Sequence, residues 1–439
     1  MLLCACSFFC ILAKTEKKGG IRMKRCLQIQ IAVSSLLCMF LLEMQIRTGI
    51  LSPVKSGIII STLMISLILL QLRDKSEYFF NASQIVNVLF LPYDLEMAYL
   101  AFFQLLFKFF PQATNLIGIL RIVGFAFVLV PVTVVSYGKL RYWLSRLINI
   151  EMVVFTFLIF DDYPLISPNS FLRNFEYSGL VCALSFIVFL YLVLKGWGLK
   201  LWINIRQKWT RVFTFTTIGL IAFGIWYDFF AAFIQIADNF SEAIWNWNFS
   251  LLNPNQSLFF PGNPSLVYLA TLDAGIFEEL ERYAILVVLA GALKNKKFRA
   301  QKMVLISALI FSLSHYPNMI SEHKDFITTS YQVMDVFAIG CLLAIIYLYT
   351  GKLWLAMIVH GVWDFLVFAM IPATMDIASF LDLYVPSGIL VPVVINAVGI
   401  PIIIFMLSGK RLSHIEKNIY TLLKPTKSVM VVNKIIPQN

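Results

Sequence analysis

Three carboxylates and an arginine interrupt an apolar stretch of this chain. Glu278, Glu279, Glu281 and Arg282 lie within a run of apolar residues from about Val267 to Leu293. Such a run is long enough to cross a bilayer as a helix, which takes roughly 20 apolar residues. A charged side chain near the helix centre costs on the order of 3 kcal/mol, so these groups need partners, water or protonation. Either Glu278 or Glu279 can pair with Arg282 within one helical turn, and a purely structural ion pair is the simplest alternative.

Two of the four histidines also fall in apolar segments that are expected to be membrane helices. His315 follows Phe311 by one helical turn, and His360 precedes Asp364 by one turn. Asp364 can therefore hydrogen-bond His360 and fix its tautomer. Histidines, carboxylates and arginine at bilayer depth indicate a functional site. A buried glutamate can take a proton from water, and imidazoles can donate to an oxyanion or, with a carboxylate, bind zinc.

These motifs, in this order, resemble the CPBP family, the CAAX prenyl protease and bacteriocin-processing (Abi) intramembrane endopeptidases. That family has a double glutamate followed by arginine on one helix, Phe-x-x-x-His on the next, and His-x-x-x-Asp or Asn two helices later. The matching residues here are Glu278-Glu279 with Arg282, Phe311 with His315, and His360 with Asp364. The resemblance covers residues 267–371, and the preceding spans match no family that we can name.

The first motif departs from the family in its spacing. Three residues usually separate the second glutamate from the arginine, whereas two residues separate Glu279 from Arg282 here. Keeping the arginine in register places Phe277 and Glu278 where the two glutamates belong. Either Glu278 or Glu279 is therefore the expected catalytic base, and Glu278 is slightly favoured.

The resemblance implies an intramembrane endopeptidase in which His315, His360 and Asp364 act with the glutamate. It also implies that Arg282 and Phe311 support these groups. The family is described both as a metalloprotease and as a metal-independent, glutamate-dependent enzyme. We expect no obligatory metal cofactor, with His315 and His360 as the ligands if zinc is bound.

The composition indicates a polytopic membrane protein. Of the 439 residues 59% are hydrophobic and only 13% charged, and the mean hydropathy is +0.81; a soluble protein averages about 45–50% apolar and 25% charged residues. The net charge of +11 lies in short clusters between apolar runs, which indicates topology and excludes nucleic acid as a partner. The seven cysteines show no spacing typical of a disulfide framework or a metal site.

The apolar runs predict an all-α fold of about 12 transmembrane helices. The expected spans are Cys26–Gln45, Gly57–Leu72, Ala82–Phe110, Leu116–Tyr137, Leu147–Phe160, Ser178–Leu194, Val212–Ala237, Val267–Leu293, Val304–Ile320, Tyr331–Tyr349, Leu353–Ile371 and Gly388–Leu407. Lysine and arginine are concentrated in alternate loops, so both termini are expected in the cytoplasm. The expected location is the cell membrane, as a multi-pass protein of a bacterial plasma membrane.

Five segments are expected along the chain. They are an N-terminal extension (1–25, with Met23 as an alternative native start), an N-terminal transmembrane module of about seven helices (26–237), an interfacial loop (238–266), a CPBP-like catalytic bundle (267–407) and a basic cytoplasmic tail (408–439). Aromatic residues interleaved with Asn, Ser and Pro favour the membrane interface for the loop.

The main functional hypothesis is hydrolysis of a membrane-associated peptide or lipid-anchored protein, in contact with membrane lipids. Prenylated proteins, bacteriocin or signalling-peptide precursors and self-immunity all fit as the biological context. One alternative is a non-catalytic CPBP-like scaffold or regulator, suggested by the shortened motif. Another is a proton-coupled transporter, for which buried ionisable residues such as Asp335 are typical. The absence of a repeat between the two halves argues against the transporter.

Overall fold

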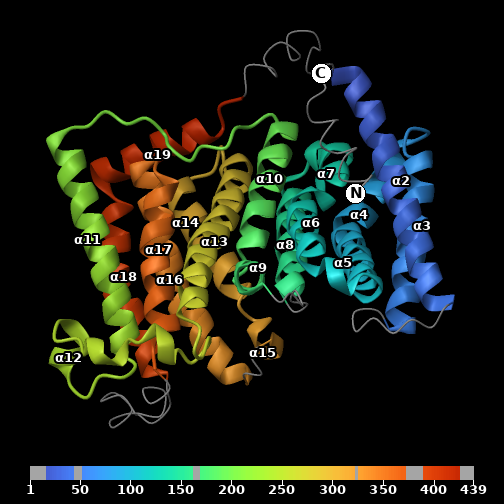
Figure 1. Cartoon of the computed structure of the whole chain (residues 1–439). Helices are drawn as coiled ribbons and strands as arrows, with labels where there is room; N and C mark the ends of the chain where they lie inside the picture. The colour runs from blue at the N-terminus through green and yellow to red at the C-terminus, as the bar shows by residue number, and fades with distance from the viewer. Residues whose placement is uncertain (1–15, 44–51, 162–168, 322–324, 372–388, 426–439) are drawn as a thin grey trace. The chain divides into compact units, whose positions relative to one another are not determined.

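The described chain is helical and divides into two compact units. The computed structural model describes residues 16–43, 52–161, 169–321, 325–371 and 389–425. Within these ranges the extended backbone is limited to two isolated bridges, Asn204 with Lys352 and Leu252 with Met370. The first unit runs to Leu201 and the second from Trp202 to Lys424. The prediction of an all-α polytopic membrane protein is confirmed (Figure 1).

Fewer helices qualify as membrane spans, judged by their length and composition, than the sequence predicted. Five helices are long and apolar enough to cross a bilayer, or eight if each of three bent helix pairs makes one span. The expected count of about 12 is therefore not confirmed. It had included the helix Pro264–Ala292, which carries several charged residues, and the helix Leu353–Ala369, which is only 17 residues long. Which helices cross the membrane, and in which direction, stays a prediction.

The first unit is a bundle of helices of very different lengths. They are α2 (Glu16–Glu43), α3 (Pro53–Leu72), α4 (Glu77–Leu89), α5 (Leu91–Phe109), α6 (Thr114–Val128), α7 (Val130–Val135), α8 (Trp143–Asp161), α9 (Ser170–Tyr177) and α10 (Leu180–Gly196), with 3-10 turns η1 (Pro111–Ala113) and η2 (Tyr137–Lys139). Helix α2 begins at Glu16, so the last part of the expected extension (1–25) is helical, because Lys, Arg and Glu are good helix formers. Residues 1–15 lie outside the described residues.

The irregular span expected over Ala82–Phe110 is a pair of helices. Helices α4 and α5 meet at an angle of 49°. Pro92 lies in the first turn of α5, where the missing N–H of proline costs no helical hydrogen bond and its fixed φ favours a new helix. The proline therefore explains why one apolar stretch forms two helices.

A buried ion pair joins α6 to α9 in the first unit. Arg121 Nη2 lies 2.6 Å from Glu176 Oε1, and the two side chains are only 3% and 2% exposed. The rings of Phe125, Phe157 and Phe186 pack in sequence beside α6, with centroids 5.3 and 6.3 Å apart. The charge of Arg121 is thus neutralised inside an aromatic core.

The second unit contains the residues that the sequence singled out. Its helices are α11 (Arg211–Phe233), α12 (Phe240–Ile244), α13 (Pro264–Ala292), α14 (Arg299–Leu313), α15 (Asn318–Ser321), α16 (Phe326–Thr350), α17 (Leu353–Ala369), α18 (Leu390–Met406) and α19 (Gly409–Leu422), with 3-10 turns η3 (Phe249–Leu251) and η4 (Pro254–Gln256). Helix α11, which the sequence had placed in the N-terminal module (26–237), belongs here, because it packs on α16 and α17. A Cβ at Gly224 of α11 would lie 3.1 Å from the Val359 side chain and 3.4 Å from that of Ile346.

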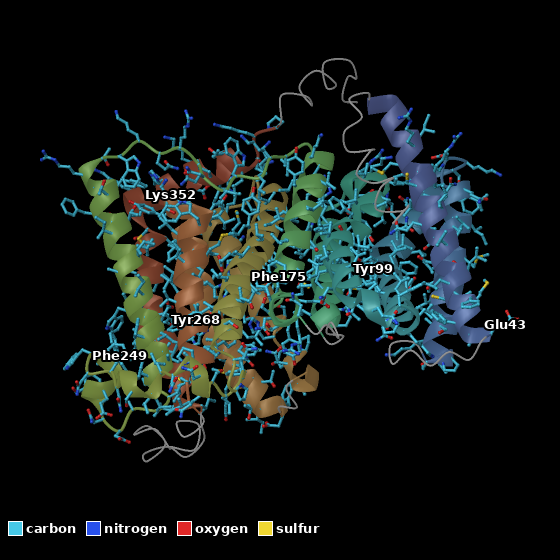
Figure 2. All side chains as sticks on the ribbon, viewed as in Figure 1. Glu43, Tyr99, Phe175, Phe249, Tyr268 and Lys352 are labelled. Atoms are coloured by element: carbon cyan, nitrogen blue, oxygen red, sulfur yellow. The ribbon has the colours of Figure 1, made fainter. Side chains whose placement is uncertain are left out.

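The segment expected to be an interfacial loop (238–266) covers one end of α17. The Asn253 N–H donates to the Ala369 carbonyl at 2.8 Å, and the Ser257 hydroxyl donates to the Phe368 carbonyl at 2.5 Å. The Phe229 ring of α11 packs on Trp247 and on Phe249, which is labelled in Figure 2. These bonds satisfy carbonyls that a helix end leaves without partners. An interfacial position for this segment stays a prediction.

The expected basic tail (408–439) begins with a packed helix. Helix α19 turns by 80° from α18 and buries Ile415, Ile419 and Leu422, whose spacing of four and three residues makes one apolar face. The Asn418 side chain donates to the carbonyls of Leu348 and Tyr349 at 2.8 and 3.0 Å. This part of the tail is therefore integral to the second unit, and residues 426–439 lie outside the described residues.

Candidate active site

The site forms where α13 and α17 run side by side (Figure 1). A Cβ at Gly275 would lie 2.8 Å from the Met357 carbonyl oxygen and 3.2 Å from the Gly361 nitrogen, so only glycine permits this separation. The ring of Tyr268, labelled in Figure 2, stacks on Phe365 with centroids 5.8 Å apart. Early residues of α13 therefore meet late residues of α17, and the two helices are antiparallel. Their close approach brings the glutamates one turn beyond Gly275 to the histidine of α17.

Glu279 is the buried centre of the cluster. Its side chain is fully buried, and its Oε1 accepts a hydrogen bond from Arg282 Nε at 3.0 Å. The same oxygen lies 2.9 Å from His360 Nδ1. The sequence left open which glutamate pairs with Arg282, and the structure pairs it with Glu279.

Arg282 is held by two other helices besides its own bond to Glu279 on α13. Its guanidinium carbon lies 3.7 Å from the centroid of the Phe311 ring on α14, a cation–π geometry. A Cβ at Gly340 of α16 would lie 3.1 Å from Arg282 Nη1. The small residue on α16 and the aromatic ring on α14 thus fix the arginine that orients Glu279 on α13.

The second ring nitrogen of His360 faces two further carboxylates. Nε2 lies 3.3 Å from Glu278 Oε2 and 3.5 Å from Asp364 Oδ2. Both distances are longer than a normal N–H···O hydrogen bond, so this nitrogen is held less tightly than Nδ1. The Glu278 side chain is 27% exposed, whereas Glu279 is not exposed at all. Glu278 is therefore the partly exposed member of the glutamate pair.

His315 lies just beyond the end of α14, not inside a helix over Val304–Ile320 as expected. Pro317 disfavours helical backbone in the residue before it, and the chain turns at residues 314–317. His315 Nδ1 lies 3.0 Å from the Phe311 carbonyl oxygen. Because a carbonyl only accepts hydrogen bonds, Nδ1 carries the proton and Nε2 of the neutral ring is an acceptor.

The Phe311 ring packs against both histidines. Its centroid is 5.0 Å from the His315 ring and 6.0 Å from the His360 ring. Glu278 and His360 interact electrostatically with His315. The predicted residues of three motifs are thus brought together by α13, α17 and the end of α14, with both histidine rings against Phe311.

Asp228 of α11 is a neighbour of the cluster that the sequence reasoning missed. It is 1% exposed and interacts electrostatically with His360 and Asp364. Among the described residues neither of its carboxylate oxygens has a hydrogen-bond partner. A signal was present, since Asp228 is the one acidic residue in the apolar helix over 211–233.

The arrangement does not fit a zinc site. Both nitrogens of His360 face carboxylates, and Nδ1 of His315 is bonded to the Phe311 carbonyl in the last turn of α14. Nowhere in the described ranges do three His, Cys, Asp or Glu side chains group so as to hold a metal ion. The metal independence of the reaction stays a prediction.

Comparison with known proteins identifies the central part of the second unit. Residues 261–366 match the family described as type II CAAX prenyl endopeptidase Rce1-like. The match begins just before α13 and ends within α17, so it includes every predicted site residue. No curated protein and no solved structure matches the chain. The resemblance stated from the sequence motifs is confirmed.

Proposed function

We propose, from the premise that this chain carries an Rce1-like domain of a protease family, that it is an intramembrane endopeptidase. Its substrate class would be a membrane-associated peptide or a lipid-anchored protein. The observation that carries the proposal is the cluster of Glu278, Glu279, Arg282 and His360, in which the Glu278 carboxylate is partly exposed while Glu279 is fully buried and paired with Arg282 and His360. A purely structural ion pair needs no exposed carboxylate.

Glu278 is the general base of the proposed reaction. Its carboxylate accepts a proton from a water molecule, and the resulting hydroxide attacks the carbonyl carbon of the scissile peptide. His315 assists because Nε2 of its neutral ring can accept a hydrogen bond from the same water. The base is thus the partly exposed member of the glutamate pair.

His360 stabilises the oxyanion that forms on the carbonyl oxygen. Glu279 holds Nδ1 at 2.9 Å, so the ring is fixed on that side, while Nε2 has only long contacts to carboxylates. Because the Glu279 carboxylate only accepts, Nδ1 carries a proton, so the donor is the imidazolium form of His360, which the facing carboxylates favour. Its Nε2–H can turn to the developing negative charge. When the C–N bond breaks, the proton on Glu278 passes to the leaving amine and restores the carboxylate.

Glu279, Arg282 and Asp364 act as positioning residues. Arg282 orients Glu279, and Glu279 in turn orients His360. Asp364 lies one turn from His360 on the same face of α17 and supports the same ring from its other side. The rigidity of this set reduces the reorganisation needed during the reaction.

The proposal is tested by comparing the terminal peptides of membrane proteins from cells that carry the wild-type chain or Glu278→Gln. New carboxyl termini are expected with the wild type alone, at equal amounts of the two proteins in the membrane. When the digestion is repeated in H₂¹⁸O with the purified chain, one ¹⁸O atom is expected in each new terminus, since water supplies the attacking oxygen. Identical termini from both cells would contradict proteolysis and favour the scaffold hypothesis.

A further inference from the structure

A second polar site lies in the first unit, and none of its residues belongs to the Rce1-like domain. A cavity of about 600 Å³ opens between the start of α4 and the segment that joins η2 to α8, a size typical of small-molecule sites. Its lining includes Arg73, Ser76, Gln84, Lys139, Arg141 and Tyr142. Nothing in the proposed proteolysis uses this cavity.

The cavity is predominantly basic. Arg73, Lys75, Lys139 and Arg141 line it, against two acidic side chains, Asp74 and Glu77. Asp74 already accepts a hydrogen bond from Lys24 on α2 at 2.5 Å, and this bond lowers the pKa of the Asp74 carboxyl. One of the two acidic groups is therefore neutralised from outside the lining, and the cavity favours an anion.

Arg73 is the buried cation of this cavity. Its side chain is 6% exposed, donates through Nη1 to the Val135 carbonyl at 3.3 Å, and has its guanidinium carbon 5.4 Å from the Phe80 ring centroid. Within the described ranges its Nε has no hydrogen-bond acceptor, and the nearest carboxylate oxygen, on Asp74, lies at 3.6 Å. Buried donors in proteins are usually bonded, so this one is available to a ligand.

The walls of the cavity are fixed by a buried hydrogen-bond network. The Ser136 hydroxyl donates to Gln84 Oε1 at 2.9 Å, and Asn87 donates to Ser136 at 3.2 Å. The Tyr137 hydroxyl donates to the Asn87 carbonyl at 2.9 Å. These bonds join α4 to η2, so the basic groups on the two walls are held at a set separation before any ligand binds.

The neighbouring surface has the composition of a membrane interface. Tyr142 is 72% exposed, and next to it Trp143 is 49% exposed; tyrosine and tryptophan favour the headgroup level. Lys139 and Arg141 lie between the expected spans Leu116–Tyr137 and Leu147–Phe160, and loops rich in Lys and Arg are expected on the cytoplasmic side. Basic pockets between membrane helices on that side can hold phosphorylated lipid head groups.

We propose that this cavity is a phosphate-binding site, with an anionic phospholipid head group or soluble phosphate as the source. Arg73 Nε would donate to the phosphate from the buried end, and Lys139 and Arg141 would neutralise it from the exposed end. The first turn of α4, which begins at Glu77 behind the cap residue Ser76, adds backbone N–H groups on the same wall.

The test is native mass spectrometry of the full chain, released from detergent after titration with phosphatidylglycerol or phosphatidylcholine. The wild type is compared with the double variant Lys139→Gln/Arg141→Gln, whose two side chains are exposed at the cavity. The matched control is Arg206→Gln/Lys208→Gln, an equally spaced and exposed pair outside the cavity. We expect the cavity variant to bind phosphatidylglycerol about 10- to 30-fold more weakly, and the control to bind as the wild type does.

A parallel titration with inorganic phosphate separates the two sources. If millimolar phosphate displaces phosphatidylglycerol from the wild type but has no such effect on the cavity variant, the site would be assigned to soluble phosphate. Retention of phosphatidylglycerol would assign it to the lipid. Equal binding of the two phospholipids by the wild type, or equal losses in the cavity and control variants, would overturn the proposal. Because the readout is binding, the result is independent of proteolysis.

Discussion

Each unit buries an arginine against a glutamate, and the two pairs differ in their surroundings. Arg121 and Glu176 are 2.6 Å apart in the first unit, and Arg282 and Glu279 are 3.0 Å apart in the second. All four side chains are nearly inaccessible. The pair in the second unit is joined to His360 through Glu279, and a second glutamate beside it is partly exposed. The pair in the first unit has no histidine, because that unit contains none in its sequence to residue 201.

The comparison shows that buried charge alone does not identify a catalytic site in a membrane protein. Either pair neutralises an arginine and can hold helices together. Chemistry additionally requires a group that can exchange a proton and a route for water. In the second unit we propose Glu278 and His360 for proton exchange, and the partial exposure of Glu278 for access of water.

The largest effect is expected when each arginine is removed in turn. Arg121→Gln and Arg282→Gln each leave a glutamate buried without its charge partner, so each should lose about 3–5 kcal/mol of stability. Only Arg282→Gln should also lower cleavage per folded molecule. Thermal unfolding in detergent and the cleavage rate of the surviving folded fraction measure the two effects. If Arg121→Gln also lowered cleavage per folded molecule, the pair in the first unit would contribute to activity as well, and the distinction between the two pairs would be wrong.

Removing the histidine of the cluster should nearly abolish cleavage. His360→Ala removes the proposed oxyanion donor, so the rate should fall by about 10²–10³. The matched control is His414→Ala, because His414 packs against the rings of Phe213 and Tyr349 in the same unit and outside the cluster. Steady-state cleavage by the two variants should differ by at least 100-fold. Equal rates would contradict the role given to His360.

The separation of α13 and α17 can be changed at one glycine. Gly275→Ala places a methyl group 2.8 Å from the Met357 carbonyl oxygen and should cost about 1–3 kcal/mol, with a matching loss of activity as the glutamates move from His360. Gly219→Ala on α11 is the control, because nothing lies within 4 Å of its added Cβ. Unfolding temperatures of the two variants, measured side by side, test whether close helix packing builds the site. Equal temperatures would show that it does not.

The smallest effect is expected at Asp364. Asp364→Asn removes a charge but keeps an oxygen that can accept a hydrogen bond from His360, so cleavage should fall by about tenfold or less. Asp364→Leu, of similar size, removes the acceptor and should fall further. The ratio of the two rates measures how much orientation alone contributes. A greater loss in the asparagine variant would mean that the charge matters more than orientation.

The sequence predicted the helical class and most of the site. The class follows from composition. Glu279, His360 and Asp364 were predictable as neighbours because helical spacing and the order of the motifs place them at one depth of the bundle. Asp228 could also have been singled out, because it is a single acidic residue in an apolar helix. Its place beside the site could not be predicted, because helical spacing does not show which helix packs beside α17.

Other features depend on packing that a sequence does not display. Glu278 and Glu279 both lie within a turn of Arg282, so spacing alone does not show which of them pairs with it. Phe311 and Gly340, on other helices, fix the position of the guanidinium and so favour the pair with Glu279. His315 was placed inside a helix because the apolar pattern continues past it. Pro317 was the local signal that the helix ends earlier. The boundary of the second unit was misjudged because apolarity does not reveal helix partners.

The most direct test of the account compares Glu278→Gln with Glu279→Gln in liposomes, at matched amounts of folded protein. The substrate is a membrane protein whose new carboxyl terminus appears only in cells that carry the wild-type chain. Glutamine keeps the size of the side chain but cannot accept the proton, so Glu278→Gln should lose about 100-fold or more in rate while unfolding as the wild type does. Glu279→Gln should unfold at a lower temperature, because Arg282 loses its charge partner. Full cleavage by Glu278→Gln would contradict the central claim that Glu278, the partly exposed glutamate, is the base.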